Sequence, residues 1–182
     1  ENFAEGMTDD LITDLSKSSA LSVIARNSTF FYKGKPVKIS QVAEELGVRY
    51  VLEGSVQRAG DQVRVNAQLI DALTGGHVWA DRFDRDLTDI FAIQDEITQS
   101  IVEQLKIRLL PKEKKAIAKA PTMNVEAYTH YLKGREFFHN STRAFLLLAR
   151  RMFVKATEAD PLYALAYAGI ANCDSRLSGW YN

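Results

Sequence analysis

The stretch VRYVLEGSVQRAGDQVRVNAQLIDALTGGHVWADRFDRDLTD, residues 48–89, decides the fold. From Val51 to Arg58 the side chains alternate between two sets, as expected where neighbours point to opposite faces of a strand. Ala59-Gly60-Asp61 has the composition of a tight turn. A return strand follows, and one of its faces is apolar: Val63, Val65, Ala67 and Leu69.

A second turn and a third strand complete the pattern. Asp71–Gly76 supplies the turn, and His77–Phe83 reads as the strand. We expect an antiparallel sheet with one packed face and one face toward water. A long amphipathic helix over Thr88–Leu110 should cover the packed face, because isoleucines recur every three or four residues from Ile90 to Ile101.

The upstream segment predicts helices and one short strand. Met7, Leu11 and Leu15 mark one face of a helix that we expect to begin near Thr8. Leu21–Ala25 reads as a buried strand, with Arg26 and Asn27 at its carboxyl end. Since that edge of an α/β sheet often carries ligands, Arg26 and Asn27 are candidate contacts for a small molecule. The alternative is a loop whose polar side chains bond the local backbone.

The two ends of the chain differ in pattern. Residues 1–110 predict an α+β domain: a small, mainly antiparallel sheet packed by helices. Residues 111–124, charged and flanked by prolines, read as a linker. Residues 125–182 are helical throughout, with Phe153 and small alanines placed to pack paired helices and Asp160-Pro161 as a terminator.

The sequence also resembles a known domain family. EGSVQRAGDQVRVNAQLIDALTGGHVWADRFDRDLTDIFAIQDEI is similar to the TolB-amino-terminal-like domain of bacterial signalling proteins, and so are EGMTDDLITDLSK, VIARNSTF and VAEELGVRYVLEGSV. The helical segment resembles truncated tetratricopeptide (TPR) repeats. In such proteins the domain commonly follows a class III adenylate/guanylate cyclase domain, and sometimes a winged-helix DNA-binding domain.

The resemblance carries expectations about partners. The family has a further strand before the position of Glu1, so the sheet is expected to show an open edge that can recruit a second copy. The chain has no initiator Met, and we interpret it as part of a longer protein. Four tyrosines of the helical segment could face a peptide groove, although packing between helices is the alternative: Tyr128, Tyr131, Tyr163 and Tyr167.

Composition restricts the functions further. The formal net charge is zero, which argues against a dedicated nucleic-acid surface. The single cysteine, Cys173, suits a reducing compartment and predicts a cytoplasmic location, and no apolar run is long enough for a membrane span. His77, His130 and His139 lack metal-ligand spacing, and no glycine-rich phosphate loop or nucleophile motif is present. We therefore expect no cofactor and no catalytic residue.

Three functional hypotheses follow. The first is a non-catalytic regulatory and protein-interaction region of a class III nucleotide cyclase whose catalytic domain lies elsewhere. The second is the regulatory region of a winged-helix transcriptional regulator. The third is an enzyme with an unrecognised site, which would need a deep pocket with converging polar groups.

Overall fold

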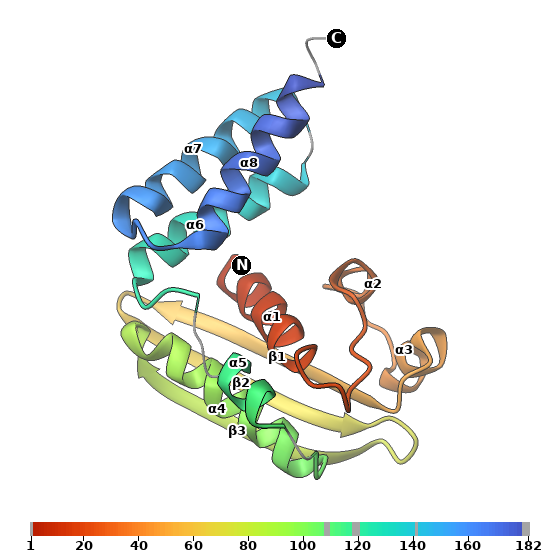
Figure 1. Ribbon diagram of the computed structural model, residues 1–182. Helices are drawn as coiled ribbons and strands as arrows, with labels where there is room; N and C mark the ends of the chain where they lie inside the picture. The colour runs from red at the N-terminus through yellow and green to blue at the C-terminus, as the bar shows by residue number, and fades with distance from the viewer. Residues whose placement is uncertain (1, 108–109, 118–120, 141, 180–182) are drawn as a thin grey trace. The chain divides into compact units, whose positions relative to one another are not determined.

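The computed structural model describes residues 2–107, 110–117, 121–140 and 142–179. The chain divides into two compact units, of which residues 7–119 contain the sheet. The other unit combines residues 1–6 with residues 120–182. The predicted α+β class is confirmed, because a small antiparallel sheet with its helices is followed by an all-helical segment (Figure 1). The predicted boundaries at residues 110 and 125 stay a prediction.

The sheet has the three predicted strands in the order β1-β2-β3: β1 Tyr50–Ala59, β2 Gln62–Asp71 and β3 Gly76–Asp86. Both pairings are antiparallel. Gly60 has a φ of 61° in the turn between β1 and β2, a conformation that costs glycine little. The register between β2 and β3 shifts at Leu69/Ile70, where a β-bulge lets the strand end bend toward the second turn.

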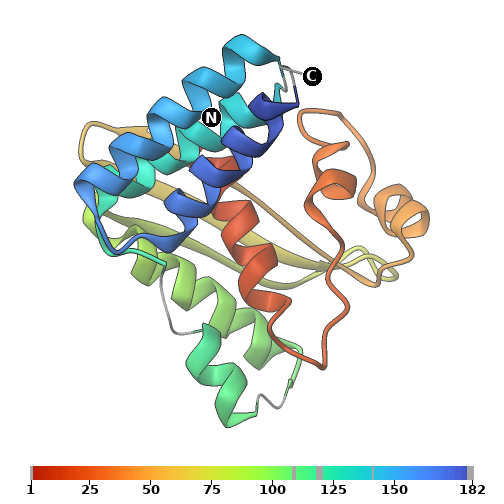
Figure 2. The same cartoon turned by 45° about the horizontal axis from the view of Figure 1, so that its top comes forward.

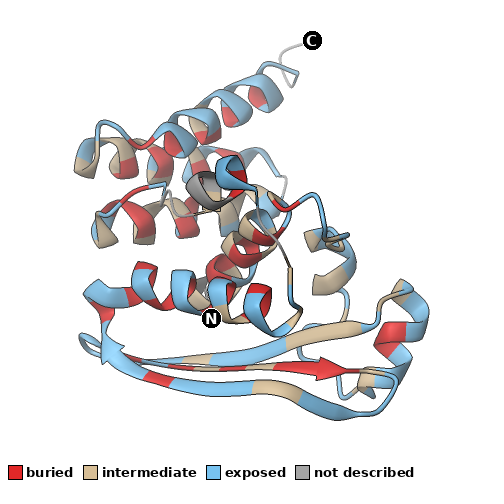
Figure 3. Ribbon diagram, turned by 60° about the horizontal axis from the view of Figure 1, so that its bottom comes forward, coloured by how far each residue is buried: buried red, intermediate tan, exposed pale blue. Residues whose placement is uncertain are grey.

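The two faces of the sheet differ as predicted. On β2 the apolar set from Val63 to Leu69 is buried, while Arg64 on the other face is exposed. Helix α4, Ile90–Gln104, lies on the apolar face, and α1, Asn2–Leu15, runs on the same side (Figures 2 and 3). Four isoleucines of α4 are at most 2% exposed, and burying each contributes about 1.5–3 kcal/mol.

Helix α4 is shorter than the predicted Thr88–Leu110. A 3-10 turn over Leu87–Asp89 precedes it, and it ends before Leu105. The end is a Schellman motif: the amide of Ile107 donates to the carbonyl of Val102 at 3.0 Å, and Lys106 adopts a φ of 53°. Two residues of the predicted helix, 108 and 109, lie outside the described residues.

Two predictions for the upstream segment are wrong. Helix α1 begins at Asn2 and not near Thr8, because its apolar face extends back through Gly6 and Phe3. The predicted strand over Leu21–Ala25 does not form; within the described residues it has no ladder partner, and backbone pairing makes a strand as much as apolar composition does. Helix α2, Arg26–Phe30, follows directly, and α3, Ile39–Leu46, leads to β1.

The predicted linker contains a helix. Helix α5, Pro111–Ile117, starts with proline at its first position, where the missing amide is not needed. The Glu113 carboxylate accepts the amide of Leu110 at 2.7 Å, which closes the first turn, and the amide of Ser19 at 2.9 Å. These two bonds hold α5 against the segment that follows α1, and they keep the pKa of Glu113 below its usual value.

The helical unit consists chiefly of α6 Val125–His139, α7 Arg143–Ala159 and α8 Ala164–Ser178. Asn124 caps α6 by accepting the amide of Ala127 at 3.0 Å, and its side-chain amide donates to the carbonyl of Ala159 at 2.9 Å. The ring of Phe153 is 2% exposed. A Cβ atom added to Gly134 or to Gly169 would lie within 2.8 Å of that ring, so only glycine fits on either side of it.

Candidate interaction surfaces

Arg26 and Asn27 do not lie at the end of a strand. They open helix α2, and the Arg26 side chain is engaged within its own unit. Its Nε atom donates to the Asp9 carboxylate of α1 at 2.8 Å, and its guanidinium lies 3.9 Å from the centre of the Phe30 ring. Asn27 is exposed. Arg26 therefore joins α2 to α1, and its assignment as a ligand contact stays a prediction.

A second polar contact joins α1 to α4. The Gln94 side-chain amide donates to the Asp10 carboxylate at 3.2 Å, and Gln94 is 5% exposed. Near the end of α1, burial raises the pKa of Asp14, although Lys17 at 2.6 Å opposes the shift. The Gln94–Asp10 contact thus holds α1 against α4, whereas the Asp14–Lys17 pair is local to the end of α1.

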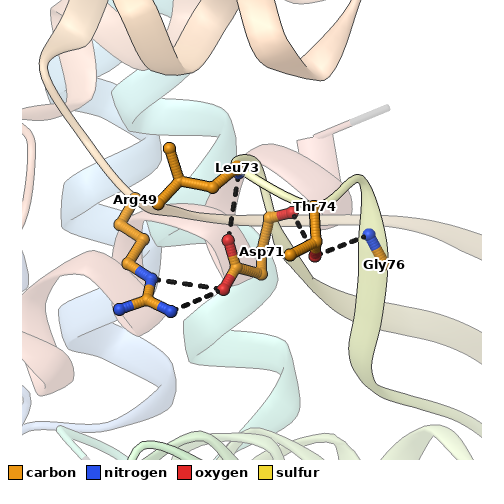
Figure 4. Close-up of polar contacts among 5 residues, drawn as sticks. All are labelled: Arg49, Asp71, Leu73, Thr74 and Gly76. Carbon is orange, nitrogen blue, oxygen red and sulfur yellow. Dashed lines mark hydrogen bonds and ion pairs between the residues drawn. The ribbon is translucent and has the colours of Figure 1, made fainter.

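The turn between β2 and β3 is built around Asp71. One carboxylate oxygen of Asp71 accepts two bonds from the Arg49 guanidinium, at 2.9 and 3.2 Å, and the other accepts the amide of Leu73 at 3.0 Å (Figure 4). The Thr74 hydroxyl donates to the backbone carbonyl of Asp71, and the Gly76 amide donates to the Thr74 hydroxyl. The Arg49 guanidinium holds the pKa of Asp71 below its usual value. This cluster ties the start of β1 to the hairpin.

Three of the four candidate tyrosines belong to the packing of the helical unit. Tyr128 is 1% exposed and meets the ring of Phe3 edge-on, with 5.9 Å between centroids. Tyr163 is fully buried and lies 5.0 Å from the ring of Tyr131. Tyr131 in turn packs on Phe153 at 5.7 Å. Tyr128, Tyr131 and Tyr163 thus pack between helices, and their assignment as partner contacts stays a prediction.

Tyr167 differs from the other three tyrosines because half of it is exposed. Leu162, which is 90% exposed, and Leu165, which is 42% exposed, belong to the same turn and helix. We call Leu162, Leu165 and Tyr167 together the α8 surface; Leu165 and Tyr167 lie on either side of the buried Ala166 and flank the buried face of the helix. The two leucines were missed in the sequence, although they lie outside the buried series of α8: Ala166, Gly169, Cys173 and Leu177.

The described residues contain no group of three or more His, Cys, Asp or Glu side chains that could hold a metal ion. The thiol of Cys173 is buried, and burial raises its pKa to about 11, so it stays protonated and weakly nucleophilic near neutral pH. Its neighbour Asp174 pairs with Arg150 of α7 at 2.6 Å. None of the described helices is long and apolar enough to cross a membrane.

Comparison with known proteins places these elements in a family. Residues 2–103 match the family described as HilA/YgeH-like transcriptional regulator, second domain, and the chain belongs to this family. The match spans α1 to α4 and thus includes the whole sheet. The description differs from the expected TolB-amino-terminal-like family, so that resemblance and the TPR interpretation remain proposals.

A relative extends the similarity into the helical unit. The chain is 49% identical over 169 residues to a protein of Rhizobium meliloti (strain 1021) named "Putative adenylate cyclase 3". The alignment covers 93% of this chain and 29% of that protein. The chain is thus related to an adenylate cyclase-type protein, and it spans less than a third of that relative's length.

Proposed function

We propose that this chain is a non-catalytic regulatory and protein-interaction region of a bacterial signalling protein whose output domain is a class III nucleotide cyclase. One observation carries the proposal: the 49% identity to the protein named as an adenylate cyclase runs through both compact units while using 29% of its length. In this proposal the sheet unit is a TolB-amino-terminal-like domain, and the protein works in the cytoplasm.

The helical unit would supply the interaction. We assign α6 and α7 to one TPR-like pair and α8 to the next repeat. The support is the packing of Phe153 between Gly134 and Gly169 and the fully buried alanines of α7. Exposed aromatic and aliphatic side chains mark contact sites for other proteins. The α8 surface is therefore the proposed contact for a protein partner, with Tyr167 as its aromatic residue.

The second candidate function is favoured by the family itself. Its description is that of a transcriptional regulator's second domain, which would make this chain the regulatory region of a DNA-binding protein. Both candidates assign the same role to this chain and differ in the output domain attached to it.

The test uses the natural full-length protein that contains this chain. Purified protein should convert ATP to cyclic AMP and should not retain DNA fragments of its own promoter region. Sequence-specific DNA binding without cyclase activity would replace the first candidate by the second.

A companion variant examines the regulatory role. Leu165→Glu with Tyr167→Glu should change cyclase activity in cell extract, where a partner is present. Arg151→Glu, an exposed charge reversal on α7, should not. Equal activities for both variants would show that the α8 surface has no regulatory role.

A further inference from the structure

The outer edge of β3 carries an unusual order of charges. The sequence Asp81-Arg82-Phe83-Asp84-Arg85 occupies the middle of the strand. Reading it backwards exchanges every acidic residue for a basic one, with Phe83 at the centre. If two copies of β3 pair antiparallel about Phe83, Arg82 faces Asp84 of the second copy and Asp81 faces its Arg85. The two-fold symmetry repeats both pairs, so four oppositely charged pairs form.

The backbone of β3 is available for such pairing. Within the described residues β3 is hydrogen-bonded to β2 alone, and no other segment of its unit runs along its outer side (Figure 3). The amide of Leu87 donates to the carbonyl of Asp61, on the β2 side, at 2.7 Å. Because donors alternate along a strand, the amides of Arg82 and Asp84 point away from β2.

A contact of Arg82 supports this alternation. The Arg82 amide donates to the Asp81 carboxylate of its own strand at 2.7 Å, so it is satisfied locally at the open edge. In the proposed pairing it donates instead to the carbonyl of Asp84 in the second copy. Arg82 and Asp84 would then form hydrogen-bonded pairs on both sides of a central, non-bonded Phe83 pair.

The charges also select one register. The neighbouring two-fold registers are centred on Arg82 and on Asp84, and each places two like charges directly opposite one another. Like charges at directly opposite positions destabilise a pair of strands. The register centred on Phe83 avoids this, and it keeps the helix-covered face of both copies on the same side, because directly opposite residues of antiparallel strands share a face.

The side chains concerned are accessible. The side chain of Arg82 is 63% exposed, that of Asp84 is 43% exposed and that of Arg85 is 44% exposed. Asp84 already accepts from Arg64 at 2.5 Å and from Arg82 at 3.0 Å, which fixes it on the open face of the sheet. Arg85 contacts Glu96 of α4 at 3.2 Å on the other face.

We infer that β3 is a homodimerisation edge, at which a second copy of this chain adds its own β3 antiparallel and centred on Phe83 to form one continuous six-stranded sheet. The interface is isologous: each copy gives the same residues to the contact. This inference is independent of whether a cyclase or a DNA-binding domain is attached.

The experiment measures the dimer dissociation constant of the 182-residue chain by sedimentation equilibrium. Arg82→Glu alone and Asp84→Lys alone each place two like-charge pairs in the interface, and each should weaken the dimer by about tenfold. An equimolar mixture of the two variants restores all opposite pairs in the heterodimer. The mixture should therefore associate about as tightly as the natural chain.

A matched control separates the two edges of the sheet. Arg58→Glu reverses a charge on β1, the opposite edge strand, and should leave the dissociation constant unchanged. Circular dichroism of every variant checks that the sheet is intact. A natural chain that stays monomeric at the highest concentration overturns the inference. So does a dimer that Arg58→Glu disrupts and Arg82→Glu does not, or a mixture that associates no better than either variant.

Discussion

At the scale of single residues, the ring of Phe153 determines how the helices of the second unit approach one another. It is buried between Gly134 of α6 and Gly169 of α8, and it also contacts Tyr131. Glycine costs a helix up to about 1 kcal/mol relative to alanine. Glycine stands at these two helical positions because the Phe153 ring occupies the space that a Cβ atom would need. The helical backbone itself does not favour glycine.

We predict that Gly134→Ala lowers the free energy of unfolding by about 1–2 kcal/mol, since overpacking outweighs the gain in helix propensity. The new Cβ atom would lie 2.6 Å from the Phe153 ring, which is enclosed and cannot move away cheaply. Urea unfolding measures the change. In a Phe153→Leu background the same substitution should cost much less; an equal loss in both backgrounds would contradict this account.

The Asp71 carboxylate gives a pH-dependent prediction. Its pKa is lowered from 3.8, first by the Arg49 hydrogen bond, so its charge stabilises the folded state at neutral pH. That stabilisation is present above the unfolded-state pKa and is lost as pH falls through the lower folded-state pKa. Asp71→Asn should therefore lower the melting temperature near pH 7, and the difference from the natural chain should shrink below pH 3.8. A difference that is constant with pH would show that charge is not involved.

At the scale of elements, local signals predicted the sheet well. The alternation on either side of Gly60 identified both strands and their turn, and the isoleucine spacing identified α4. Element ends were harder to predict. Lys106 ends α4 in a left-handed conformation that usually calls for glycine, so the sequence contained no stop signal there.

Non-local packing explains what the sequence could not indicate about other segments. Leu21–Ala25 has the composition of a strand but no ladder partner among the described residues. Arg26 looked like a free polar group, and its engagement by Asp9 and Phe30 depends on the packing of α2 against α1. Among the tyrosines, equal helical spacing could not separate the buried Tyr163 from the exposed Tyr167.

Lys106 supplies a prediction at this scale. Lys106→Gly should raise the free energy of unfolding by about 0.5–1 kcal/mol, because a left-handed conformation strains any residue with a Cβ atom and glycine adopts it freely. Lys106→Ala is the matched control, since it removes the same side chain and keeps the strain. The urea midpoint distinguishes the two variants, and an equal gain from alanine would assign the effect to the lysine charge.

At the scale of the whole molecule, the net charge is zero, but the acidic and basic residues of β3 follow a definite order. Charged residues on an edge strand normally keep sheets from joining. The order of charges along β3 instead selects one register of pairing. It disfavours the shifted registers and favours the register centred on Phe83. The β3 edge is thus complementary to a second copy of itself in this register.

This distribution predicts a specific response to salt. Exposed ion pairs are screened as the Debye length falls, whereas backbone hydrogen bonds between strands are affected far less. Raising sodium chloride from about 0.05 M to about 0.5 M should weaken the natural dimer by about fivefold. The matched double variant Arg82→Gln with Asp84→Asn keeps side-chain hydrogen bonding but removes both symmetry-related Arg82–Asp84 ion pairs of the open face, and it leaves the Asp81–Arg85 pairs in place. It should associate more weakly at low salt and depend less on salt, so that the two dissociation constants converge at high salt. Parallel salt dependences for the two proteins would mean that the charges of β3 do not meet across the dimer axis.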